Sequence, residues 1–203
     1  MFDMLEELAA IHRNVAVNGS SGTVSVTVSR SYTAEADDVW DALTNPERIP
    51  RWFYPISGDL KAGGTFQLEG NAGGDILECA RPVHLQVTFG GPESIVDLRL
   101  AEDGGRTTLE LTHSVPVAMA GSGAGALFVG PGWDGALLGL SIHLRGELIG
   151  DPQQAANSPE VVEFNRGSIA GWKEAIESSG TASAEEIAGA HQAALAQYTV
   201  LPS

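Results

Sequence analysis

The sequence predicts an α+β fold in which an antiparallel sheet packs against one long apolar helix. Residues 23–32 alternate between apolar and small polar side chains, which is typical of a half-buried strand. Further short segments with turn-forming residues between them follow, and hairpin-length links favour antiparallel pairing. Residues 133–149 are apolar nearly all round a helix, so this helix needs a broad partner, and the sheet is the one available.

The first 22 residues are predicted to form a helical arm. Leu5, Leu8 and Ile11 recur at roughly helical spacing over residues 1–13. The cluster of Asn, Gly and Ser at residues 18–22 is typical of a turn and separates the arm from the first strand.

A short helix is expected directly after the first strand, with Thr33 as its N-cap and Asn45-Pro46 at its end. The aromatic run Trp52-Phe53-Tyr54 follows. These three side chains cannot all point into a core, because neighbours in a helix are rotated by about 100° and neighbours in a strand alternate faces. At least one of them is therefore predicted to face something else.

The remaining elements follow from alternation, turn residues and helix caps. The five later strands are expected at residues 66–69, 75–80, 83–89, 94–100 and 106–113. Residues 115–132 are rich in Gly and Ala and are predicted to be irregular. Two more helices are expected, one from Ser158-Pro159 to Gly180 and one over residues 183–198. The domain organisation predicted is an arm (1–22), a sheet-and-helix domain (23–150) and a helical extension (151–203).

Composition argues against several classes of partner and site. Acidic residues outnumber basic ones 26 to 11, giving a net charge of -15, so nucleic acid and anionic membranes would be repelled. Cys79 is the single cysteine, so neither an internal disulfide nor a cysteine zinc site can form. No secretion signal or apolar run of about 18 residues is present, and a cytoplasmic location is expected.

Several segments, in this order and spacing, resemble one known family. They are Val39–Arg48 (VWDALTNPER), Arg51-Trp52-Phe53, Gly58–Phe66, Gly70–Gly74, Thr107–His113 and Gly132-Trp133. Over about residues 23–148 the chain resembles the SRPBCC or START-like superfamily, in the branch named after the activator of the heat-shock-protein-ninety ATPase, short bacterial single-domain form. The resemblance implies an α+β helix-grip fold, in which a curved antiparallel sheet wraps the long helix and leaves a cavity between them.

The function expected from this resemblance is binding of a small hydrophobic molecule in that cavity. Resemblance and face parity together select the candidate ligand-binding residues Trp52, Phe53, Phe66, Leu68, Phe89, His113, Trp133 and Leu137. No catalytic residue, cofactor or metal site is predicted. A co-chaperone-like interaction module and a cavity enzyme of cyclase or hydrolase type are the alternatives.

Four features carry open alternatives. His113 shares the parity of Leu109 and Leu111, so it is either a cavity histidine or a hydrogen-bonded strand end. Arg30 is either a carboxylate anchor at the cavity rim or an ion-paired arginine. The glycines of the long helix allow either close backbone approach or room for a ligand. The terminal helices pack either on their own domain or on a second subunit of a homodimer.

Two further patterns are not expected to form sites. Gly121–Ala126 superficially fits a dinucleotide fingerprint, but Pro116 weakens the preceding strand, and residues 130–132 would break the receiving helix. His143 and Glu147 have i, i+4 spacing, but no third metal ligand is found by spacing.

Overall fold

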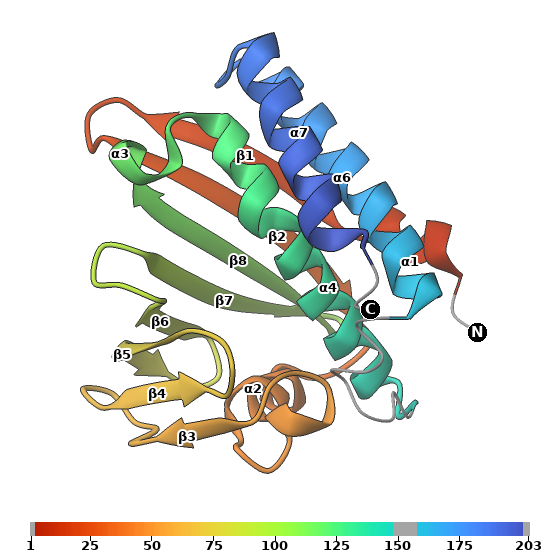
Figure 1. Cartoon of the computed structure of the whole chain (residues 1–203). Coiled ribbons are helices and arrows are strands. Elements are labelled where there is room, and N and C mark those ends of the chain that lie inside the picture. Colours follow the sequence, from red (N-terminus) through yellow and green to blue (C-terminus); the bar gives the residue numbers. More distant parts are fainter. Residues whose placement is uncertain (1–2, 148–157, 201–203) are drawn as a thin grey trace.

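The computed structural model describes residues 3–147 and 158–200. Within them, eight strands form one antiparallel sheet in the order β1-β2-β8-β7-β6-β5-β4-β3 (Figure 1). The strands are β1 (His12–Asn18), β2 (Thr23–Tyr32), β3 (Ile56–Gly58), β4 (Thr65–Leu68), β5 (Gly73–Ala80), β6 (His84–Thr88), β7 (Ile95–Asp103) and β8 (Arg106–Pro116). Strands β3 to β8 form a meander, and β2 then pairs with β8, as expected for the predicted helix-grip fold.

One long helix crosses the inner face of this curved sheet, and the C-terminal helices pack on its other side (Figure 1). The helices are α1 (Met4–Ala9), α2 (Ala36–Thr44), α3 (Val117–Ala120), α4 (Ala126–Leu144), α6 (Pro159–Ser179) and α7 (Ala184–Tyr198), with 3₁₀ turns η1 (Ile49–Arg51) and η2 (Gly123–Gly125). The α+β architecture predicted from the sequence is confirmed.

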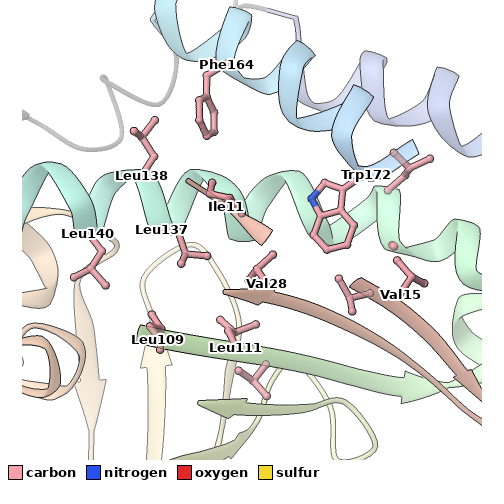
Figure 2. Packing of buried hydrophobic residues seen from close by; sticks show 14 of the residues in the cluster. Ile11, Val15, Val28, Leu109, Leu111, Leu137, Leu138, Leu140, Phe164 and Trp172 are labelled. Atoms are coloured by element: carbon pink, nitrogen blue, oxygen red, sulfur yellow. The ribbon is translucent and has the colours of Figure 1, made fainter. Parts of the chain in front are cut away.

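Helix α4 is buried because it has apolar partners on two sides. Leu137 and Leu140 point toward the strands, whereas Leu138 points toward Phe164 of α6 (Figure 2). Trp172 of α6 is fully buried where α6 packs on α4 and β1. This explains why the helix is apolar nearly all round: no broad face of it is left for water.

The helical arm is a wrong prediction beyond Ala9. Residues 12–18 form strand β1, which pairs with β2 in a hairpin. Val15 is buried on the face toward the helices, and both of its chain neighbours are exposed. A strand suits this alternation and its β-branched valines better than a helix does. Strand β3 is also absent from the sequence prediction, since three residues are too few to show a period.

The long helix begins at Ala126 and not at Trp133 as predicted. Pro131 lies inside it, although proline removes one helical hydrogen bond. Ala126 and Leu127 are completely buried, so packing holds the first turns in place. A Cβ on Gly130 would lie 2.4 Å from the ring of Trp172, so the apparent helix breaker is a position where α6 approaches α4 closely.

The helix ends were predicted with mixed success. Ser158 caps α6 and Gly180 ends it in the left-handed conformation, as predicted. Helix α7 also begins after Ser183 as predicted, and a capping box between Ser183 and Glu186, which was not predicted, holds this end. Thr33, in contrast, does not cap α2. The N-cap is Glu35, and the N–H of the first helical residue donates to the carboxylate of Glu102 at 2.7 Å.

Candidate functional site

A cavity of about 160 Å³ lies between the sheet and α4. Its wall is contributed by α2, η1 and the segment that follows, the strands from β3 to β8, and one face of α4. Apart from Thr44 and Cys79, every lining residue is apolar. The cavity is therefore a place where an apolar molecule loses contact with water without leaving polar protein groups unpaired.

The structure brings most of the predicted site residues together. Seven of the eight line the cavity: Trp52, Phe53, Phe66, Leu68, Phe89, Trp133 and Leu137. The inward-facing residues Leu85, Val87, Val96, Leu98, Leu109 and Leu111 complete much of the wall. Strand alternation had already placed these residues on one face, although they were not proposed as ligand contacts.

The aromatic run after η1 divides its side chains between two roles. The indole N–H of Trp52 donates to the carbonyl oxygen of Ala42 at 3.1 Å, which ties η1 to α2. The ring of Phe53 stacks on Trp52 at 5.3 Å between centroids, and both line the cavity. Tyr54 packs edge-on against Phe53 and lies outside the wall.

His113 lies behind the wall and not in it, which corrects its predicted placement. Its Nδ1 accepts a hydrogen bond from the indole N–H of Trp133 at 3.2 Å, and its Nε2 lies 2.8 Å from the hydroxyl of Ser94. Burial lowers the pKa of His113 to about 4, so the ring is neutral at pH 7. With both nitrogens engaged, His113 has no lone pair available to act as a general base on a molecule in the cavity.

Cys79 is a lining residue that sequence reasoning missed. Its place in a strand between Glu78 and Ala80, with no basic neighbour in sequence, predicts core or sheet filler. A register irregularity between Ile76 and Glu78 in β5 turns both Ile76 and Cys79 toward the cavity. No local residue pattern signals this irregularity.

The polar side chains of the wall are largely satisfied within the protein. The hydroxyl of Thr44 donates to the carbonyl oxygen of Trp40 at 2.8 Å. The indole N–H groups of Trp52 and Trp133 are also paired, as described above. Among the described wall side chains, only the thiol of Cys79 is left to face a ligand with a polar atom. A cavity enzyme would need at least two ionisable groups that converge inside the cavity. The described residues of the wall do not include such a pair.

The other candidate residues serve packing and ion pairing. The Nη2 of Arg30 donates to Glu7 at 2.6 Å and to Ser141 at 2.8 Å, away from the cavity wall, so Arg30 is an ion-paired arginine. His143 lies against Arg48, while Glu147 pairs with Arg145. Within residues 3–147 and 158–200, no three potential ligand side chains are placed to hold a metal ion.

The segment Gly121–Ala126 does not lie between a strand and a helix, as a dinucleotide-binding turn does. Helix α3 precedes it where the fingerprint needs a strand. The expected helix break at residues 130–132 is absent, as α4 begins at Ala126. A Cβ on Gly123 would lie 1.9 Å from the hydroxyl of Thr181, so close packing explains this glycine.

The fold and its cavity define an SRPBCC-type helix-grip protein. A family model described as Activator of Hsp90 ATPase homolog 1-like protein matches residues 33–144. This match spans more than half of the chain, and the chain belongs to that family.

Solved structures agree with this assignment. The crystal structure of CalU16 from Micromonospora echinospora is 36% identical, covers 82% of this chain and 98% of CalU16, and has a TM-score of 0.66. The solution structure of CalU16 is 37% identical over 84% of this chain and 97% of that one, with a TM-score of 0.68. DynU16, from the dynemicin biosynthetic locus, is 25% identical over 61% of this chain and 48% of DynU16, with a TM-score of 0.54. No curated protein matches the chain. None of the described helices is long and apolar enough to cross a membrane.

Proposed function

We propose that this protein binds a small, uncharged, largely apolar molecule in the cavity between the sheet and α4. The observation that carries the proposal is the wall itself, in which all residues but Thr44 and Cys79 are apolar and the hydroxyl of Thr44 is already paired. A charged or strongly polar ligand would lose its hydration there without gaining hydrogen bonds, whereas an apolar ligand would gain from leaving water.

The size of the cavity limits the ligand. Apolar protein cavities of about 150 Å³ bind benzene, whereas sites for drug-sized ligands occupy roughly 300 Å³ or more. A cavity of about 160 Å³ therefore suits a molecule with about one ring. The presence of the related DynU16 in a biosynthetic locus also supports a small-molecule ligand. Chaperone binding stays a prediction supported by the family description alone.

Benzene provides the first test, with thermal unfolding as the measurement. Ligand that binds only the folded state raises its stability by about 2.7 kcal/mol at a hundredfold excess over Kd, which is a shift of several degrees in Tm. Ala136 lines the cavity from α4, so Ala136→Phe is expected to fill the space and abolish the benzene-dependent shift.

The matched control is Ala170→Phe, the same substitution at an exposed position of α6. This variant is expected to keep the full shift with benzene. Equal shifts in both variants, or no shift in the unmodified protein, would contradict binding in this cavity.

A further inference from the structure

One side of the cavity is a contiguous set of aromatic rings. Phe66 comes from β4, Phe89 follows β6, and Trp133 comes from α4. The ring centroids are 6.3 Å apart for Phe66 and Phe89, and 5.2 Å apart for Phe89 and Trp133. All three line the cavity. We call them the aromatic wall.

His113 supports this wall from behind. Its ring meets Phe89 edge-on at 5.9 Å and Trp133 edge-on at 5.7 Å between centroids. The ring is buried, with 6% of the residue exposed, and it lies outside the cavity lining. Two of the three rings of the aromatic wall therefore rest on a single side chain.

The hydrogen bonds of His113 fix its tautomer. An indole N–H can only donate, so Nδ1 of His113 must be the unprotonated acceptor from Trp133. The proton of the neutral ring is then on Nε2, which donates to the hydroxyl oxygen of Ser94. The chain from Trp133 through His113 to Ser94 runs in one direction and is complete at each nitrogen.

This chain restricts the orientation of Trp133. An indole ring turned away from its present position would leave its N–H without the partner that Nδ1 supplies, in surroundings that are otherwise apolar. The aromatic wall thus presents ring faces and edges in a fixed arrangement. Aromatic ligands interact favourably with such rings in offset-stacked and edge-to-face geometries, in addition to the gain from burying apolar area.

We propose that His113 is a positioning residue that fixes the aromatic wall, and that this wall makes the cavity selective for planar aromatic ligands over saturated ones of similar size. The inference rests on the proposed function and deepens it by naming the ligand class. His113 acts through Trp133 and Phe89, without touching the ligand.

The test compares benzene and cyclohexane, which have the same number of carbons, in three proteins: unmodified, His113→Leu and His113→Gln. Leu removes both hydrogen bonds, whereas Gln keeps one acceptor and one donor. The ratio of the two affinities is compared between proteins, so the different solubilities of the ligands cancel. We expect the affinity for benzene divided by the affinity for cyclohexane to be about two- to tenfold lower in His113→Leu than in the unmodified protein. In His113→Gln this ratio is expected to be largely retained.

A second readout needs no ligand. Two-dimensional ¹H–¹⁵N NMR of the unmodified protein is expected to show an unprotonated Nδ1 and a protonated Nε2 for His113, and an indole N–H of Trp133 protected from exchange. In His113→Leu this N–H is expected to exchange faster.

The outcomes separate the two proposals. If both ligands bind and the ratio is unchanged in His113→Leu, the positioning role is overturned while the proposed function stands. A proton on Nδ1 of His113 in the unmodified protein also overturns the positioning role. This NMR result does not depend on whether His113→Leu folds. If neither ligand binds the unmodified protein, the proposed function fails, and the ligand selectivity inferred here fails with it.

Discussion

Asp134 on α4 carries a carboxylate with no exposed surface, and its partners lie on β1 and α6. Its Oδ2 accepts hydrogen bonds from Nε of Arg13 at 2.8 Å and from the hydroxyl of Ser168 at 2.5 Å. Within residues 3–147 and 158–200, Oδ1 has no hydrogen-bond partner. Burial raises the pKa of Asp134 to about 6, against the attraction of Arg13.

The raised pKa gives a prediction at the residue scale. Because folding favours the protonated form of Asp134, its contribution to the free energy of unfolding falls as pH rises from about 4 through 6. Asp134→Asn has no such titration. The free energy of unfolding of this variant, minus that of the unmodified protein, is expected to increase by about 1 kcal/mol from pH 5 to pH 7. Urea unfolding at the two pH values measures this difference.

The control for this titration is Glu186→Gln, also a carboxylate-to-amide change. Hydrogen bonds from Ser183 lower the pKa of the exposed Glu186, so it stays ionised throughout this range. The effect of Glu186→Gln on stability is expected to be the same at pH 5 and pH 7. A difference between Asp134→Asn and the unmodified protein that does not change with pH would contradict the assignment of a raised pKa to Asp134.

At the scale of elements, the glycines of α4 show how a helix is fitted to its neighbours. A Cβ on Gly139 would lie 2.8 Å from the carbonyl oxygen of Trp52, and one on Gly130 would overlap the ring of Trp172. Among the described residues, a Cβ on Gly135 would meet nothing within 4 Å. Close approach therefore explains Gly130 and Gly139, and Gly135 has no explanation in the described contacts.

Two substitutions on this helix are expected to have opposite signs. Gly135→Ala is expected to stabilise the protein by about 1 kcal/mol, because alanine favours a helix interior and space is open. Gly130→Ala is expected to destabilise it by roughly 1–3 kcal/mol, because Trp172 must move. Urea unfolding measures both. Stabilisation by both substitutions would argue against tight contact between α4 and α6.

At the scale of the whole molecule, ion pairs and hydrogen bonds join the N- and C-terminal elements to the central sheet and helix. Glu7 of α1 pairs with Arg30 of β2 at 2.6 Å and with Arg145 after α4 at 2.8 Å. Arg13 of β1 and Ser168 of α6 meet at Asp134 of α4. The described terminal elements thus pack on their own domain, one of the two arrangements that the sequence left open. A homodimer remains a prediction.

These contacts predict that α6 and the sheet unfold as one unit. The central amides of α6 and those of β8 are expected to exchange with the same free energy of opening in native-state hydrogen exchange. Trp172 of α6 is fully buried, so Trp172→Ala is expected to lower both values together by about 3–5 kcal/mol. A much lower opening energy for α6 alone, with β8 unaffected by Trp172→Ala, would show that the C-terminal extension unfolds separately.

The sequence by itself determined the elements whose signals are local. Strand β2 has the predicted bounds, Ser158 and Gly180 delimit α6, and α7 begins after Ser183. Alternation, N-caps and glycine C-caps depend on residues within a few positions of each other. Together with the family resemblance, they gave the helix-grip fold and seven of the eight predicted site residues in the cavity wall.

Only the tertiary structure decided where these elements bend, begin and leave space. The irregularity of β5 brings Cys79 into the cavity, α4 continues through Pro131, and His113 supports Trp133 from behind the wall. Each depends on partners distant in the chain: β6 for Cys79, α6 for the start of α4, and Ser94 with α4 for His113. The physical reason is that packing energy from distant contacts exceeds local propensity, so local signals alone could not predict these features.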